Sequence, residues 1–445
     1  MVKDLTVGTP SKTLWMYTVP LVLSTIFQQL YTMADSMIAG KYAGKAALAA
    51  VGASYPITMI FIALAAGTNI GCSVVISQLF GSKKMEGMKT AAYTSIVSTF
   101  ALSVFMTVLG AFFCSGMIKM LNTPQDIFYE SSLYLRIYIF GVVFLFMYNT
   151  CNGIFTALGD SKTPLYFLIM SSVFNVVLDL VFVIKFKWGV AGVAWATFIA
   201  QGVAGVMAFF VLINRLKKIE TKGKVSFFSI GMLKRISVMA VPSACQKSFV
   251  SVGNLMIQTL VNSFGSDVIA GFSAGMRINT FVVTNIITLG NGLSGYVAQN
   301  YGACKVDRVK EGVKAGYIMM SVFALVSTLI LMLFPGQLMG LFVDPTEGLA
   351  VIDVGAKFLR VVAPFFVVAC LKICCDSVLR GTSCAVPFMV TTFADLILRV
   401  GLSFILVDSF GEMGIWYSWP IGWAIGAVLS FIFYKSGIWN KAKTE

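Results

Sequence analysis

Residues 46–82 read AALAAVGASYPITMIFIALAAGTNIGCSVVISQLFGS and contain no charged side chain. A helix needs about 20 apolar residues to cross a bilayer, so this run holds a spanning helix, which we expect to begin near Pro56. Six further charge-free runs, each long enough for one spanning helix, occur at 13–34, 90–118, 137–159, 188–214, 315–343 and 413–434.

Five more apolar segments are interrupted by a few charged residues, at 163–184, 236–262, 268–299, 354–380 and 386–407. With these segments the sequence predicts twelve transmembrane helices. The composition agrees, because 58% of the residues are hydrophobic and 12% are charged, against about 25% charged in soluble proteins. A soluble fold is excluded, and we expect an all-α, polytopic membrane protein.

Positive charge is distributed unevenly between alternate loops. The loops on one side of the predicted helices, including both termini, carry 21 Lys and Arg residues, and those on the other side carry five. Because cytoplasmic loops are enriched in Lys and Arg, we expect both termini in the cytoplasm and the chain in the plasma (inner) membrane. The formal charge of +14 is then an orientation signal that attracts anionic lipid, and no nucleic-acid partner is expected.

The residue types exclude several kinds of chemistry. Histidine is absent, which excludes histidine metal sites, Ser-His-Asp catalysis and a histidine proton relay. The nine cysteines lie mostly within apolar runs and form no CxxC pair, so we interpret them as small hydrophobic residues. No HExxH or GxSxG motif is present. We therefore expect neither an enzyme nor a cofactor.

The two halves of the chain resemble each other at an offset of about 222 residues. Pro20 matches Pro242, and residues 77–81 (SQLFG) match 298–302 (AQNYG). Because six helices per half is an even number, both halves share one orientation and are related by a pseudo-two-fold axis along the membrane normal. Such a duplicated architecture favours a transporter with a central cleft.

The most basic segment of the chain separates these two halves. The sequence predicts an amino-terminal six-helix bundle at 1–214, a basic cytoplasmic linker at 215–235 and a carboxyl-terminal six-helix bundle at 236–445. We expect the protein to act as a monomer in the lipid bilayer, with small organic molecules as its substrates.

Several short motifs occur in a fixed order along the chain. They are Pro20-Leu21, FQQLYTMAD at 27–35, Gly40, LAAVG at 48–52, SQLFG at 77–81, ALGDSKTP at 157–164 and NVVLD at 175–179. Together they resemble the MATE family, the multidrug and toxic compound extrusion transporters, over the whole chain. The resemblance implies a bacterial secondary antiporter that exports organic, often cationic, compounds in exchange for sodium ions or protons.

Two acidic residues, Asp35 and Asp179, lie inside predicted helices. Ionisable side chains at membrane depth are costly and usually belong to a pathway or a paired site. Gln28 precedes Asp35 by two helical turns and Asn175 precedes Asp179 by one, each on the same helix face, so both are candidates for cation binding. Resemblance to archaeal and DinF-like members assigns a cation site to Asp35, Asn175, Asp179 and Thr197.

This predicted site suits either of two coupling ions. Carboxylate, amide and hydroxyl oxygens suit Na⁺, and no other metal is expected. Two close carboxylates also suit a proton, because each raises the proton affinity of the other. A purely structural role, in which the acids only satisfy polar groups of neighbouring helices, remains the alternative.

The carboxyl-terminal half departs from the NorM-type branch, whose members carry a glutamate in helix 7. This chain has Lys247 there instead. Lys372 and Asp376 are spaced i,i+4, as are Asp395 and Arg399, and such pairs can neutralise each other within one helix. Lys247 has no partner of this kind, so we predict that it pairs with Asp376 across the cleft and acts as a gate.

Further residues are candidates for binding substrate. Arg277, near the start of helix 8, is a candidate for substrate binding or gating, as are Lys247, Lys372 and Asp376. Tyr31, Tyr55 and Phe61 are candidates for lining the cleft, because aromatic side chains adapt to varied ligands.

The leading interpretation is a cation-coupled exporter of drugs or metabolites that works by alternating access. The alternative is a flippase for a lipid-linked precursor, or a metabolite transporter, of the same superfamily. Flippases of that kind usually have fourteen helices and a strongly basic cleft. Twelve helices, with aspartates in helices 1 and 5, favour the exporter.

Overall fold

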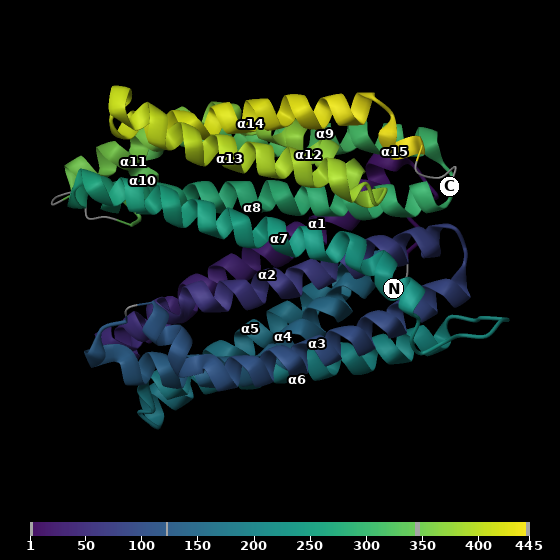
Figure 1. Cartoon of the computed structure of the whole chain (residues 1–445), viewed down its shortest axis with the longest axis horizontal. Coiled ribbons are helices and arrows are strands. Elements are labelled where there is room, and N and C mark those ends of the chain that lie inside the picture. Colours follow the sequence, from purple (N-terminus) through teal and green to yellow (C-terminus); the bar gives the residue numbers. More distant parts are fainter. Residues whose placement is uncertain (1–2, 122, 343–347, 442–445) are drawn as a thin grey trace. The chain divides into compact units, whose positions relative to one another are not determined.

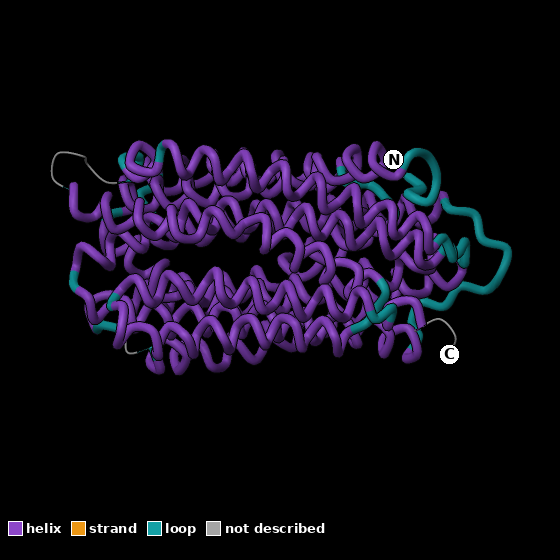
Figure 2. The backbone as a smooth tube through the Cα atoms, turned by 90° about the horizontal axis from the view of Figure 1, so that it is seen from above, coloured by secondary structure: helices purple, strands orange, loops and turns teal. Residues whose placement is uncertain are grey.

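The computed structural model describes residues 3–121, 123–342 and 348–441. Throughout these residues the chain consists of helices joined by short connections, and it contains no strand (Figures 1 and 2). The long helices are α1 (Pro10–Ile38), α2 (Lys45–Gly81), α3 (Met85–Met120), α4 (Gln125–Ala157), α5 (Lys162–Asp179), α6 (Gly189–Lys218), α7 (Ile230–Val261), α8 (Ser266–Gly302), α9 (Val306–Leu333), α11 (Leu349–Val362), α12 (Phe366–Gly381), α13 (Ala385–Phe410) and α14 (Glu412–Lys435). The all-α fold class is confirmed.

The shorter helical elements connect or extend the long ones. Two are π-helices, η1 (Ala39–Ala43) after α1 and η2 (Leu180–Lys185) after α5. The others are the 3₁₀ turns η3 (Asn262–Phe264) and η4 (Ala363–Phe365) and the short helices α10 (Pro335–Met339) and α15 (Ile438–Lys441).

Ten helical segments in the described part are long and apolar enough to cross a membrane. Among them, α5 continues through η2 as one span, and α11 continues through η4 into α12 as another. The long helices α1 and α7 bring the number to the predicted twelve.

The expectation that the second helix begins near Pro56 is wrong. The helix begins at Lys45, directly after Gly44, whose φ of +93° ends the preceding turn. Pro56 lies inside α2. A proline removes one backbone hydrogen bond, but membrane helices tolerate it where neighbouring groups satisfy the freed carbonyl.

The chain packs as two units whose limits differ from the predicted halves. The first unit contains Met1–Asp4 and Leu23–Cys245, and the second contains Leu5–Val22 and Gln246–Glu445. The first part of α1 therefore packs in the second unit, and the first part of α7 packs in the first. Both divisions fall just after the repeated prolines, Pro20 and Pro242.

Small residues explain why α7 begins in the first unit. An ideal Cβ on Gly67 of α2 would lie 2.6 Å from Cβ of Ala244, and one on Gly71 would lie 2.6 Å from Cβ of Ala240. Only glycine permits helix backbones to approach this closely.

Glycines of α8 likewise leave room for the first part of α1 in the second unit. An ideal Cβ on Gly292 of α8 would lie 2.7 Å from Cγ2 of Thr18, and one on Gly295 would lie 2.9 Å from the Tyr17 hydroxyl oxygen. Before α1, the buried backbone N–H of Leu5 donates to Oε1 of Gln299 at 2.9 Å. This contact gives a structural role to the glutamine of the repeated motif at 298–302.

The motif at 157–164 joins three helices in the first unit. Asp160 accepts hydrogen bonds from the backbone N–H and the hydroxyl of Thr163 at the start of α5, and it pairs with Arg215 near the end of α6. The Arg215 guanidinium also lies over the ring of Phe155. Burial alone would raise the pKa of Asp160, but these hydrogen bonds outweigh it and hold the pKa below its usual value.

The basic linker is hydrogen-bonded to α3. α6 runs on to Lys218 and α7 begins at Ile230, so the connection is shorter than the predicted 215–235. Its backbone N–H groups donate to side chains along α3: Gly223 to Glu86 at 3.1 Å, Ser226 to Thr90 at 3.2 Å and Ser229 to Thr94 at 3.1 Å.

Candidate cation site

Two carboxyl groups meet within the first unit. Asp35 lies in the last part of α1, and Asp179 is the final residue of α5. The two carboxyls are within hydrogen-bonding reach of each other. Asp179 is fully buried, and Asp35 is partly buried. The structure thus brings these two acids together, and their role as a cation site stays a prediction.

Polar side chains from further helices surround the two acids. Asn175 lies one turn before Asp179 on α5 and is 1% exposed. Tyr31 lies one turn before Asp35, and its hydroxyl interacts electrostatically with Asp35, with Asp179 and with Thr197 of α6.

Several buried polar atoms of this cluster have no donor or acceptor in the described part of the chain. They are Oδ1 of Asp35, both carboxylate oxygens of Asp179, and both amide atoms of Asn175. A buried polar group without a partner costs about 1–3 kcal/mol. Two carboxylates, moreover, cannot hydrogen-bond to each other unless a proton lies between them.

The local backbone is irregular at both acids. Asp179 directly precedes the π-helix η2, and Asp35 lies shortly before η1. These two π-helices pack against each other. Single π turns interrupt the regular ladder of hydrogen bonds and often occur at functional sites.

The donor set fits a hard monovalent cation or a shared proton. Asp35, Asp179, Asn175 and Thr197 offer only oxygen ligands, which suit Na⁺ and not a thiophilic or imidazole-binding metal. Within the described residues no group of three or more His, Cys, Asp or Glu side chains is close enough to hold a metal ion. The same two carboxyls, close together and poorly solvated, also suit one proton.

Sequence reasoning missed one member of this cluster. Tyr134 on α4 is 9% exposed, stacks on Tyr138 with ring centroids 6.3 Å apart, and interacts electrostatically with Asp35 and Asp179. Their i,i+4 spacing is the one feature of the sequence that could have indicated a shared polar role. It was overlooked because the two tyrosines lie in a helix that was considered only for its apolar residues.

Other predicted residues lie outside the cluster. The Gln28 side chain is exposed, and no hydrogen bond between it and the cluster occurs in the described part. Phe61 is not a cleft residue, because it is 6% exposed and packs in a core with Ile57 and Phe146. Tyr55 is 57% exposed on α2 and stays a candidate.

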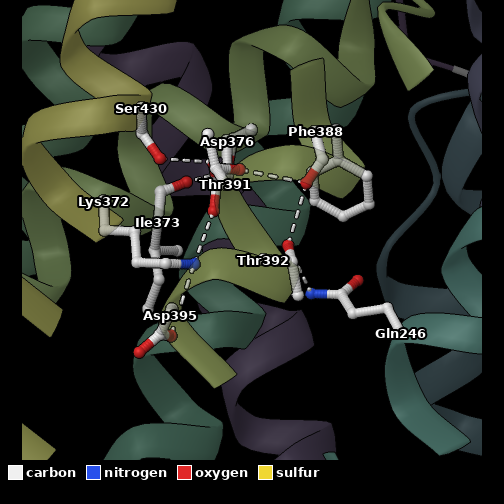
Figure 3. Close-up of polar contacts among 10 residues, drawn as sticks. Gln246, Lys372, Ile373, Asp376, Phe388, Thr391, Thr392, Asp395 and Ser430 are labelled. Carbon is white, nitrogen blue, oxygen red and sulfur yellow. Dashed lines mark hydrogen bonds and ion pairs between the residues drawn. The ribbon is translucent and has the colours of Figure 1, made fainter. Parts of the chain in front are cut away.

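The second unit contains a separate buried network of charges (Figure 3). Nζ of Lys372 lies 2.9 Å from Oδ2 of Asp376 and 3.7 Å from Oδ2 of Asp395. The other Asp376 oxygen accepts hydrogen bonds from Thr391 at 2.9 Å and from Ser430 at 2.7 Å. The network therefore links α12, α13 and α14.

This network corrects two predicted pairs. Asp376 pairs with Lys372 on its own helix, and no ion pair between Lys247 and Asp376 occurs in the described residues. Asp395 also pairs with Lys372 instead of Arg399. Arg399 lies over the Trp419 ring, 4.3 Å from its centre. The sequence shows which charged residues are one turn apart on the same helix, but it does not show contacts between two helices, such as that of Lys372 with Asp395.

The remaining predicted cations lie at exposed positions. Lys247 on α7 and Arg277 on α8 both have exposed side chains. The neighbouring Gln246 donates to the hydroxyl of Thr392 at 3.3 Å, which ties α7 to α13 (Figure 3). Whether Lys247 or Arg277 contacts substrate stays a prediction.

Comparison with known proteins now identifies the family. The MatE family profile matches residues 20–181 and again 242–405. The two matches begin 222 residues apart (242 − 20), which is the offset expected from the repeat. The chain belongs to the MatE family. As a MatE protein with many long apolar helices, it is a multi-pass membrane transporter.

MatE relatives of similar length cover nearly the whole chain. A Bacillus subtilis protein named as probable multidrug resistance protein YoeA is 26% identical over 96% of this chain and 93% of its own length. A Thermotoga maritima protein named as probable multidrug resistance protein NorM is 22% identical over 95% of this chain and 91% of its own. A FAD transporter of Shewanella oneidensis is 23% identical over 71% of each chain.

Solved structures share the MatE fold. A MOP superfamily transporter from Pyrococcus furiosus superposes with a TM-score of 0.91 at 23% identity, over 99% of this chain and 98% of that one. A MATE crystal structure in complex with MaD3S gives a TM-score of 0.91 at 22% identity, over 99% of both chains.

Proposed function

We propose that this MatE protein is an antiporter that exports small organic molecules, often cationic drugs or metabolites, in exchange for Na⁺ or H⁺. It works by alternating access in the plasma (inner) membrane, as a monomer with both termini in the cytoplasm. The cation binds in the first unit, at Asp35, Asp179, Asn175 and Thr197. Multidrug resistance proteins among the relatives support the substrate class.

One observation carries the coupling part of the proposal. Asp35 and Asp179 are within hydrogen-bonding reach, and the buried Asp179 carboxylate receives no hydrogen bond from a donor in the described residues. An arrangement of two such acids is favourable only when a cation or a proton neutralises part of their charge. Loading and unloading this ion therefore changes the charge of a buried site, which can drive a change of facing state.

The test is transport in proteoliposomes with sodium and proton gradients imposed separately. Wild-type protein moves substrate against a gradient of one or both ions, whereas Asp35→Asn and Asp179→Asn lose gradient-driven transport. Asp126→Asn is the matched control, because Asp126 is exposed at the start of α4 in the same unit. Full gradient-driven efflux by folded Asp35→Asn protein would overturn the assignment.

A second candidate substrate class is an anionic metabolite. The FAD transporter among the relatives is consistent with it, and the second unit offers cations for it. Arg380 is 8% exposed, and its Nε has no partner in the described residues. Competition by FAD with a cationic dye, in the same proteoliposomes, distinguishes the two classes.

A further inference from the structure

In the second unit the Lys372 ammonium lies in a cage formed by the carboxylates of Asp376 and Asp395. It lies between oxygens of these two carboxylates, at 2.9 and 3.7 Å. Lys372 is 7% exposed and Asp376 is 6% exposed. The charge is therefore held away from solvent, where leaving either partner alone is costly.

Two hydroxyl groups bind the other oxygen of the Asp376 carboxylate. Thr391 of α13 and Ser430 of α14 donate to Oδ1 of Asp376 at 2.9 and 2.7 Å. Oδ1 of Asp395 is buried and has no partner in the described part of the chain. Two carboxylates with hydroxyls nearby are the ligand types that a hard monovalent cation takes.

The backbone of α14 is shaped around the lysine. An ideal Cβ on Gly426 would lie 2.7 Å from Cε of Lys372, and one on Gly422 would lie 2.8 Å from Oδ1 of Asp395. Two glycines four residues apart thus leave room for the lysine stem and for the carboxylate. The position of the ammonium is fixed by packing as well as by charge.

Two buried arginines interact with the carboxylates at longer range, Arg399 with Asp395 and Arg380 with Asp376. The Arg399 guanidinium lies over Trp419 at 4.3 Å, and no ion pair between it and Asp395 occurs in the described residues. The ion-pair partner that Asp376 and Asp395 share is therefore the Lys372 ammonium (Figure 3).

We propose that Lys372 is a permanent internal cation. Its ammonium occupies the place that an exchangeable monovalent ion would take between Asp376 and Asp395. Lys372 thereby excludes sodium from this position in the second unit, and the exchangeable cation site among the described residues is the one at Asp35 and Asp179. This last statement rests on the proposed function, whereas the exclusion of sodium by Lys372 can be tested by binding alone.

The test is sodium binding in a background that lacks the first site. All proteins carry Asp35→Asn and Asp179→Asn, and thermal unfolding is followed as sodium chloride replaces choline chloride at constant ionic strength. The background protein shows no sodium response. Adding Lys372→Gln creates a saturable rise of several degrees in Tm with sodium, because binding to the folded state alone stabilises it. Adding Asp376→Asn to that variant removes the response.

The matched control is Lys357→Gln. Lys357 also pairs with an aspartate one turn away, since its Nζ lies 2.6 Å from Oδ2 of Asp353, but that pair is exposed on α11. This variant gains no sodium response. If Lys372→Gln does not yield folded protein, Lys372→Met preserves the packing of the stem, and ²²Na⁺ binding replaces the unfolding measurement.

Three results would overturn the proposal. The first is a sodium response already present in the background protein. The second is a response of equal size in Lys357→Gln. The third is a Lys372→Gln protein that is stabilised by lowering the pH but not by sodium, because Asp376 then takes a proton and the cage does not accept a metal ion. None of these results depends on transport, so they are distinct from a failure of the proposed function.

Discussion

The hydroxyl of Tyr31 on α1 interacts electrostatically with both Asp35 and Asp179, and Thr197 of α6 also acts on it. Tyr31 thus connects the two acids, which lie on α1 and α5, to a helix that carries no acid. We expect Thr197 to be near enough to a cation bound by Asp35 and Asp179 to contribute a ligand.

Replacing Asn175 or Thr197 by alanine distinguishes sodium coordination from simple protonation. If the site holds Na⁺, each substitution removes an oxygen ligand and raises the sodium concentration for half-maximal transport, about tenfold for a loss of about 1.4 kcal/mol. Sodium titrations of transport measure the shift. If the site holds only a proton, Thr197→Ala leaves the pH and sodium dependence unchanged. Ser36→Ala, an exposed hydroxyl on α1, is the control.

Replacing Asp35 by asparagine should separate stability from coupling. The amide provides a donor to the Asp179 carboxylate and removes the repulsion between two acids, so the folded protein is expected to be at least as stable as wild type. Gradient-driven transport falls to background. Thermal unfolding and a flux assay on the same preparation measure the stability and the transport. A large drop in Tm would contradict the close pairing of Asp35 with Asp179.

Asp160 gives an acid-sensitive contribution to stability. Its pKa is below the usual value, so the contribution is complete above the ordinary aspartate pKa of about 3.9 and is lost as the pH falls through the lower, folded-state pKa. Asp160→Asn loses about 2–3 kcal/mol near neutral pH, since Asp160 is 2% exposed and Arg215 is 21% exposed.

Unfolding measured between neutral and acidic pH tests this prediction. The Asp160→Asn protein should show a flatter dependence on pH than wild type at the acidic end. Asp307→Asn serves as the control, because its side chain is 95% exposed and it lies 3.9 Å from Lys310. Such a pair contributes at most about 1 kcal/mol.

A double-mutant cycle tests which lysine pairs with Asp376. Lys372→Ala and Asp376→Ala should each destabilise the protein by about 3–5 kcal/mol, and the double variant should lose much less than their sum. The same cycle with Lys247 should give a coupling energy near zero. Strong coupling between Lys247 and Asp376 would restore the pairing predicted from the sequence.

The glycines of α2 that face α7, Gly67 and Gly71, give a prediction that concerns packing alone. Gly67→Ala places a methyl group 2.6 Å from Cβ of Ala244, so it should destabilise the first unit by about 1–3 kcal/mol. Gly116→Ala on α3 is the control, because its Cβ meets nothing within 4 Å, and it should be neutral or stabilising by up to about 1 kcal/mol. Thermal unfolding of the two variants compares the effects.

Much of the fold could be predicted because hydropathy and charge determine it directly. The twelve spans follow from apolar runs, and the 222-residue repeat follows from matches such as Pro20 with Pro242. The packing units could not be predicted, since they depend on where Gly67 and Gly292 allow a neighbouring helix to approach. A glycine in the sequence does not indicate which helix it faces.

The candidate site was only partly predictable for a similar reason. Asp35 and Asp179 stand out as acids within apolar helices, and family resemblance added Asn175 and Thr197. Tyr134 was missed because an aromatic residue in an apolar helix carries no sign of the acids that it faces. The contact of Lys372 with Asp395 was missed because helical spacing reveals neighbours on one helix and not those on the next.

The small residues at the interface between α2 and α7 determine how the two helices are aligned. Gly67 and Gly71 face Ala244 and Ala240, so both helices present a small residue every four positions. Sliding α7 by one repeat, about 6 Å at 1.5 Å per residue, would set Gly67 against Ala240 and the buried Ala63 against Ala244. Gly71 would then face Ile236, whose branched side chain does not fit where the helix backbones are this close. The small residues therefore specify one register of α7 on α2, and Ile236 excludes the next one.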